Sequence, residues 1–264
     1  MVIVDLGDIS LRVQEDGSET GPPVVFANSL GTTHALWDQI IPLLPNGLRL
    51  IRYDMRGHGG SDVPTGPYSM GALIRDAERL LDHLQVRDCV FIGLSIGGMV
   101  AQGLATKRLD LVRGLVLSNT AAKMGTAQMW QDRIDAIQKD GLAGIADSVM
   151  ERWFSKRFRM SPEVARWRQM LVDTPVDGYA GCCAAIAGTD FYTTTAGLTL
   201  PTLAIAGSED GASPPDLVRE TQELIKGSRF QLIRGAGHLP CVEQPEVYAD
   251  ALTEFLHSIG HVPA

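Results

Sequence analysis

Cysteine is scarce in this sequence, with four residues among 264, and the four follow no regular spacing. Zinc sites usually contain pairs of cysteines about two to four residues apart, and small disulfide-stapled domains need a much higher cysteine density. Cys182 and Cys183 are neighbours, so a bridge between them would be strained. We therefore expect reduced thiols, no metal site and a cytoplasmic protein.

Clusters of basic residues are also missing. The 23 Lys and Arg residues are outnumbered by 31 Asp and Glu residues, which gives a formal net charge of −8. This balance argues against nucleic acid and acidic membrane surfaces as partners. An anionic small substrate is compatible with the charge only if the binding site supplies a cation of its own.

Long apolar runs and nucleotide-binding glycine motifs are absent as well. No stretch of about 18 apolar residues predicts a transmembrane helix. Residues 1–17 contain acids and lack the basic start of a signal peptide. The glycine-rich stretch 56–62 has Asp62 where a third glycine would complete G-x-G-x-x-G, and no G-K-[ST] occurs. We therefore expect no nucleotide-binding site.

Short apolar runs alternate with helical patterns along most of the chain, which predicts an α/β doubly wound domain. Residues 10–16 alternate apolar and polar side chains, as a half-exposed strand does. The other runs are almost continuously apolar and suit strands of a parallel sheet that is covered on both faces. They lie at 22–28, 48–54, 88–93, 112–119, 200–207 and 229–233. Helical patterns lie at 69–84, 96–107, 214–225 and 245–259.

Residues 121–198 interrupt this rhythm because they contain no convincing strand. They hold three of the four tryptophans, Trp130, Trp153 and Trp167, within helical patterns. We interpret residues 1–120 and 199–264 as the core and residues 121–198 as a helical lid inserted between two strands. The alternative is a helical layer with a small core of its own.

Ser95 is the first candidate for chemistry. It is the central residue of GLSIG at 93–97, which fits the pattern G-x-S-x-G of a nucleophile on a tight strand-to-helix turn. Gly93 and Gly97 suit such a turn because the backbone segments around it approach closely. The helix that starts at Ile96 would offer free N–H groups to an oxyanion. The alternative is a glycine-rich turn with an incidental serine.

A serine nucleophile needs a base and an orienting acid, and in this kind of fold they follow the serine in the order acid, then histidine. Glu209 and Asp210 follow the apolar run 200–207, and His238 follows the run 229–233. Both acids are candidates, and we favour Asp210 because an Asp-Gly turn would free its side chain. A turn aspartate and a packed loop histidine are the alternatives.

The stretch NSLGTTH that begins at Asn28 follows the first continuously apolar run. We expect it to supply a second oxyanion donor, the backbone N–H of Leu30, with Asn28 and Ser29 shaping the loop. A plain turn is the alternative. Of the other histidines, His34 is a candidate for the pocket wall, and we expect His58 to brace the site from a structural loop.

With these residues identified, the whole chain resembles the α/β-hydrolase superfamily and, within it, the 3-oxoadipate enol-lactonases. The resemblance implies Ser95 as nucleophile, Asp210 as acid and His238 as base. Many relatives have His-Gly where this chain has Asn28-Ser29, and enol-lactonases resemble this chain there. The narrower match rests on NSLGTTHALWD, GLSIGGMVAQGLA, LVLSNTAAKMGT, MERWFSKRFR, TPVDGYAGCCAAIAGTDF, LAIAGSEDGASPPDLV and GAGHLPCVEQP.

The resemblance implies a small anionic lactone as substrate, an acyl-enzyme intermediate, no cofactor and a place in the β-ketoadipate pathway of aromatic catabolism. Arg133 is our candidate for the carboxylate arm, because its planar fork suits bidentate binding. It could instead be a solvated helix residue paired with Asp132 or Asp135. Trp130 and Trp153 could line the pocket, and Trp153 could instead belong to the lid core.

Other functions are compatible with these residues. A carboxylesterase, a perhydrolase-like haloperoxidase or a carbon–carbon bond hydrolase would use the same triad. A small-molecule receptor with negligible turnover would keep the same pocket. Families with an aspartate nucleophile are disfavoured because the turn carries Ser95. Oligomeric state is left open by the sequence.

Overall fold

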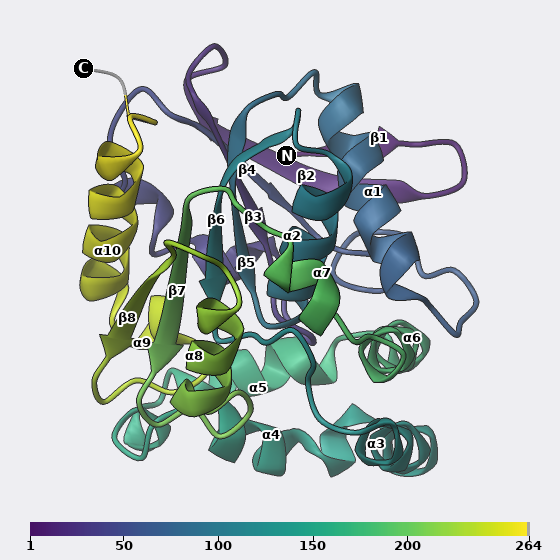
Figure 1. Ribbon diagram of the computed structural model, residues 1–264. Coiled ribbons are helices and arrows are strands. Elements are labelled where there is room, and N and C mark those ends of the chain that lie inside the picture. The colour runs from purple at the N-terminus through teal and green to yellow at the C-terminus, as the bar shows by residue number, and fades with distance from the viewer. Residues whose placement is uncertain (263–264) are drawn as a thin grey trace.

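The computed structural model describes residues 1–262, and these residues form one eight-stranded sheet (Figure 1). Its strand order is β1-β2-β4-β3-β5-β6-β7-β8. The pairs β1–β2 and β2–β4 are antiparallel, and the other pairs are parallel. The strands are β1 (Val2–Asp5), β2 (Ser10–Gly17), β3 (Pro23–Ala27), β4 (Arg49–Tyr53), β5 (Cys89–Leu94), β6 (Val112–Ser118), β7 (Thr202–Gly207) and β8 (Arg229–Ile233).

The mostly parallel sheet expected from the apolar runs is confirmed, with two differences. β1 is not among the predicted strands, although Val2, Ile3 and Val4 are β-branched residues that favour a strand; only Val4 is buried. β8 follows an apolar run but is not covered on both faces. It lies at the edge of the sheet, where Arg229 and Gln231 are exposed. Edge strands commonly carry such polar side chains because they have one strand neighbour.

Helices cover both faces of the sheet (Figure 1). They start where expected: Ser69 caps α1 by accepting a hydrogen bond from the N–H of Ala72, and prolines open α8 and α10. None of the helices in residues 1–262 is both long and apolar enough to cross a membrane. The core helices are η1 (His34–Trp37), η2 (Ile41–Leu43), α1 (Met70–His83), α2 (Ile96–Lys107), α8 (Pro215–Glu223), α9 (Pro240–Glu243) and α10 (Pro245–Ser258).

The segment between β6 and β7 is helical, and most of it lies across the carboxyl ends of the strands (Figure 1). We call α3 to α6 the lid. α7 (Tyr192–Ala196) lies instead against core helix α2, where the Thr195 hydroxyl donates to Gln102 Oε1 at 2.6 Å. The lid consists of α3 (Ala127–Asp140), η3 (Leu142–Gly144), α4 (Ala146–Trp153), η4 (Phe158–Met160), α5 (Val164–Val172) and α6 (Val176–Ala187).

Candidate active site

Ser95 lies between the end of β5 and the start of α2, at the edge of the sheet that the lid covers. Its backbone has φ 59° and ψ −120°, a strained conformation for a residue with a Cβ. Two hydrogen bonds hold this conformation. The Ser95 N–H donates to Ser118 O at 2.9 Å, and the Thr120 hydroxyl donates to Ser95 O at 2.6 Å. The turn therefore presents the Ser95 side chain to the space under the lid.

Glycines make this turn possible because the surrounding backbone leaves no room for a Cβ. At Gly93 a Cβ would lie 2.2 Å from Gly97 O, and at Gly97 it would lie 2.3 Å from Ala27 O. At Gly98 it would lie 2.5 Å from the Thr120 side chain. Local packing at the corner therefore requires the glycines of the G-x-S-x-G pattern.

His238 and Asp210 meet beside this turn, although they follow different strands. His238 Nδ1 lies 2.9 Å from Asp210 Oδ2, and both side chains are buried. A carboxylate accepts, so this contact places the proton on Nδ1 and leaves Nε2 unprotonated and able to accept a proton. Glu209, the other acid considered from the sequence, instead accepts the N–H of Lys156 at 3.1 Å.

The Asp210 carboxylate is held by three further donors. Its Oδ1 accepts the N–H groups of Ala212 at 2.7 Å and Ser213 at 2.9 Å. Its Oδ2 accepts from Asn119 Nδ2 at 2.8 Å. Such contacts fix the orientation of the carboxylate toward His238.

Ser95 and His238 line one cavity of about 210 Å³ under the lid. This volume suits a small molecule. The other lining residues are Ser29, Leu30, Met124, Gly125, Met129, Trp130, Arg133, Arg152, Trp153, Tyr179, Ala212 and Leu217.

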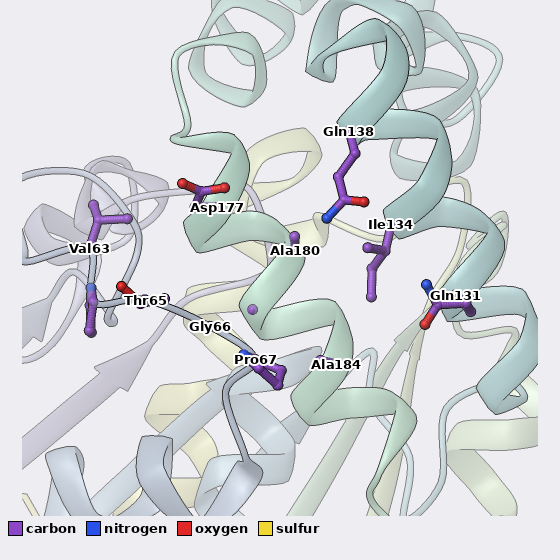
Figure 2. Close-up of a pocket in the computed structure, with 12 residues that line it drawn as sticks. Val63, Thr65, Gly66, Pro67, Gln131, Ile134, Gln138, Asp177, Ala180 and Ala184 are labelled. Carbon is purple, nitrogen blue, oxygen red and sulfur yellow. The ribbon is translucent and has the colours of Figure 1, made fainter.

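A larger cleft of about 420 Å³ lies outside this cavity (Figure 2). Its walls are the segment 63–67 and the helices α3 and α6, and the triad candidates are not among its lining residues. α3 separates the two spaces: Gln131 and Ile134 line the larger cleft, whereas Trp130 and Arg133 line the cavity with Ser95.

Of the two expected oxyanion donors, Ile96 directly follows Ser95 in the chain and Leu30 lines the cavity with Ser95. Within residues 1–262, the backbone N–H groups of Leu30 and Ile96 donate to no protein acceptor, as a site for a substrate oxygen requires. Asn28 fixes the Leu30 loop by donating to Tyr53 O and by accepting from Trp37 Nε1, both at 2.8 Å. The loop is therefore held in place before any ligand binds.

His58 braces the same loop. Its Nε2 accepts the N–H of Gly31 at 2.9 Å, and its Nδ1 lies 3.2 Å from Arg56 O. Burial lowers the pKa of His58 to about 4, so the ring is neutral at neutral pH, as acceptance at Nε2 requires. His34 does not line the cavity, contrary to its candidacy for the wall, because its Nδ1 bonds Asp54 Oδ1 at 2.9 Å.

The expected substrate-binding residues, Ser29, Trp130, Arg133 and Trp153, all line the cavity with Ser95. Both tryptophans are also almost fully buried, so each contributes to the lid core as well. Arg133 forms no ion pair with Asp132 or Asp135; these acids accept instead from Gln128 and Gln131. Its Nη1 lies 3.3 Å from Tyr179 Oη, and its guanidinium lies 5.4 Å from the Trp130 ring centroid.

Residues 22–245 match the family model of the α/β hydrolase fold. The chain belongs to the α/β hydrolase family. It is 36% identical over 250 residues to 3-oxoadipate enol-lactonase 2 of Acinetobacter baylyi, covering 93% of this chain and 92% of that protein. This confirms the resemblance found in the motifs.

Solved structures of this α/β hydrolase's relatives are similar over nearly the whole chain. The enol-lactonase from Burkholderia xenovorans LB400 has a TM-score of 0.93 and 32% identity, covering 97% of this chain and 100% of that one. A thermophilic esterase from Thermogutta terrifontis has a TM-score of 0.90 and 32% identity, covering 96% of this chain and 95% of that one.

The structure of this α/β hydrolase also contains site residues that the sequence reasoning missed. Asn119 contacts Asp210, and Arg152 lines the cavity. Asn119 had a signal, because it is a polar residue at the end of a predicted strand, whereas the helical pattern around Arg152 does not show which way its side chain faces. Glu243 accepts the N–H of Gly237, next to His238, and had no comparable signal.

Proposed function

We propose that this α/β hydrolase opens 3-oxoadipate enol-lactone to 3-oxoadipate, in the β-ketoadipate pathway, by an acyl-enzyme mechanism. The observation that carries the proposal is a half-buried cation, Arg133, in the same small cavity as Ser95 and His238. An uncharged ester would not need it, whereas a lactone with a carboxylate arm would. The similarity to two enol-lactonases supports the same substrate.

The first half of the mechanism forms the acyl-enzyme. His238 Nε2 takes the proton of the Ser95 hydroxyl as its oxygen bonds to the ring carbonyl carbon. The N–H groups of Leu30 and Ile96 stabilise the oxyanion. The bond from that carbon to the ring oxygen then breaks, His238 returns the proton to the departing enol oxygen, and the enol becomes a ketone.

The second half releases the product. Water gives a proton to His238 and attacks the acyl carbon, and the Ser95 oxygen leaves with the proton that His238 returns. Asp210 holds the imidazole in the required tautomer and stabilises it while it is positively charged. The new carboxylic acid forms beside Ser95 and loses its proton to solvent at neutral pH, so the product carries one more negative charge than the substrate.

Loss of the ultraviolet absorbance of the enol-lactone, followed with purified protein and with Ser95→Ala, tests the proposal. We expect rapid loss with the wild type, and with Ser95→Ala a rate lower by a factor of about 10⁴ or more. Ring opening by the wild type no faster than in buffer would refute the assignment.

A carboxylesterase is the second candidate, because the Thermogutta terrifontis esterase is as similar in sequence as the Burkholderia enol-lactonase. Comparing the enol-lactone with p-nitrophenyl acetate and a vinylogous diketone separates an esterase and a carbon–carbon bond hydrolase from the enol-lactonase. We expect Arg133→Ala to raise the KM of the anionic lactone at least about tenfold more than that of the neutral ester. Equal effects on both would favour the esterase.

A further inference from the structure

Arg152 is a second arginine of the catalytic cavity. It comes from α4 on the lid, whereas Arg133 comes from α3. In the part of the chain that the structure describes, neither guanidinium forms an ion pair with a carboxylate. Other lid arginines do: Arg168 bonds Asp147 at 2.7 Å, and Arg166 lies 3.3 Å from Asp38.

Nearby groups offset these two charges only in part. Burial raises the pKa of Tyr179 to about 12, so the hydroxyl beside Arg133 is an uncharged phenol at neutral pH. The Asp210 carboxylate is already bonded to His238 and Asn119 and to two backbone N–H groups. Burial lowers the pKa of Arg152 and the positive charge of Arg133 lowers it further, and these two effects outweigh the attraction of the negative charge of Asp210. Two like charges in a half-buried site repel each other, and an anion between them would relieve this repulsion.

The fold fixes Arg152 relative to the triad. Its backbone O accepts the N–H of Gly211 at 3.1 Å, and the O of Trp153 accepts the N–H of His238 at 2.8 Å. Both bonds join the end of α4 to the loops that carry the acid and the base. The backbone that carries Arg152 is therefore tied to the loops of Asp210 and His238, as a residue that orients a substrate requires.

We propose that Arg152 is a carboxylate-binding residue and that, together with Arg133, it holds the single carboxylate of the substrate between two guanidinium groups. The proposal rests on the proposed function in that this carboxylate is the arm of the lactone. The two arginines then select small carboxylates over neutral molecules of the same shape, and they set which end of the substrate faces Ser95.

Titration of the full-length protein with pentanoate and with pentanamide tests this site without requiring turnover. The two probes have the same shape, and only pentanoate is charged. We expect Arg152→Gln to weaken pentanoate binding by about tenfold or more, because a charge-assisted hydrogen bond is lost, and to change pentanamide binding by less than about threefold. Arg152→Lys, which keeps the charge but not the fork, should lie between wild type and Arg152→Gln.

The matched control is Arg168→Gln, which removes a lid arginine outside the cavity and should leave both affinities as in the wild type. Equal weakening of pentanoate and pentanamide by Arg152→Gln would mean that Arg152 only maintains the lid, and it would overturn the proposal. So would unchanged pentanoate binding in Arg152→Gln.

The enol-lactone assay separates this proposal from the proposed function. If the wild type does not open the lactone but pentanoate binding depends on Arg152, the enol-lactonase assignment fails and the carboxylate site stands. If the lactone is opened and the ratio of its KM to that of p-nitrophenyl acetate is the same in wild type and Arg152→Gln, the function stands and the role of Arg152 is refuted.

Discussion

Asn119 donates from Nδ2 to Asp210 Oδ2 at 2.8 Å, and the same oxygen accepts the Nδ1–H of His238 at 2.9 Å. Asn119 is buried and has φ 48°, in the left-handed region that asparagine tolerates better than most residues. Its own Oδ1 accepts from the Ser118 hydroxyl at 2.9 Å, which fixes which way the amide faces. Asn119 thus positions Asp210, the candidate acid, whereas Ser95 and His238 would act on the substrate.

Removing the side-chain amide of Asn119 should let the Asp210 carboxylate rotate more freely. We expect Asn119→Ala to lower the free energy of unfolding by about 2–4 kcal/mol, from the lost hydrogen bond to a charged group and the strain of alanine at positive φ. The control is Asn119→Gly, which lacks the amide but relieves the strain, so it should be less destabilised. Urea unfolding measures the stability of both variants. A pH profile of kcat/KM that differs from that of the wild type would show that Asp210 is no longer held in place. Identical stability of the alanine variant and the wild type would contradict this role.

The close approach of α2 to the Leu30 loop gives a second prediction. A Cβ at Gly97 would lie 2.3 Å from Ala27 O and 2.8 Å from Asn28 O, so Gly97→Ala must displace the loop that carries the Leu30 N–H. We expect kcat to fall by about 10²–10³, the cost of one lost oxyanion donor.

Gly71→Ala is the matched control for Gly97→Ala. Gly71 lies in α1, where the nearest atom to an added Cβ is Ser69 Oγ at 3.8 Å. We expect this variant to keep its activity and to gain up to about 1 kcal/mol of stability from the better helix propensity of alanine. A Gly97→Ala enzyme as active as Gly71→Ala would mean that the loop position does not matter for turnover.

Several of these residues could be predicted from the sequence because each follows a recognisable strand. Ser95, Asp210 and His238 come after apolar runs, and the carboxyl ends of parallel strands meet at one edge of a sheet. Arg152 could not be assigned in this way. Whether a helical arginine faces a cavity or an acid such as Asp147 depends on how the lid helices pack, and the helical pattern does not encode that packing. β1 is a different case: Val2, Ile3 and Val4 favour a strand, but a segment of four residues is at the lower limit for recognising a pattern.

The neutral state of His58 gives a third prediction, on pH. Its pKa is about 4 in the folded protein and about 6.5 in the unfolded chain, so the unfolded state binds more protons between these values. The contribution of His58 to the free energy of unfolding is therefore fully present above pH 6.5 and is lost as the pH falls toward 4. This loss is on the order of 3 kcal/mol. His58→Gln has no group at this position that titrates, so its stability should not show this pH-dependent loss.

Urea unfolding between pH 4 and 7 checks the contribution of His58. The wild type and His83→Gln, a control at an exposed histidine of α1, should lose stability in parallel on acidification. His58→Gln should start lower and show a shallower slope. Three parallel curves would mean that the ring is not held neutral against the Gly31 N–H.

Glu243 gives the last prediction because it joins the lid to the histidine loop. Its Oε1 accepts the N–H of Gly237 at 2.7 Å and of Ser155 at 3.1 Å, and its Oε2 accepts from the Ser155 hydroxyl. We expect Glu243→Ala to cost about 1–3 kcal/mol by leaving these donors unsatisfied. It should also lower kcat, because His238 follows Gly237 directly and shares its support.

Hydrogen exchange of the lid segment 152–156 distinguishes this anchoring from a general loss of stability. In Glu243→Ala, exchange should rise there and around Gly237 more than in the sheet. Glu243→Gln keeps an acceptor at Oε1, so exchange should rise less in this variant than in Glu243→Ala. Ser155→Ala removes only the hydroxyl bond, so exchange should rise least there. Uniformly faster exchange in Glu243→Ala would instead mean that Glu243 stabilises the fold as a whole, and that His238 is positioned by Asp210 and the Trp153 carbonyl alone.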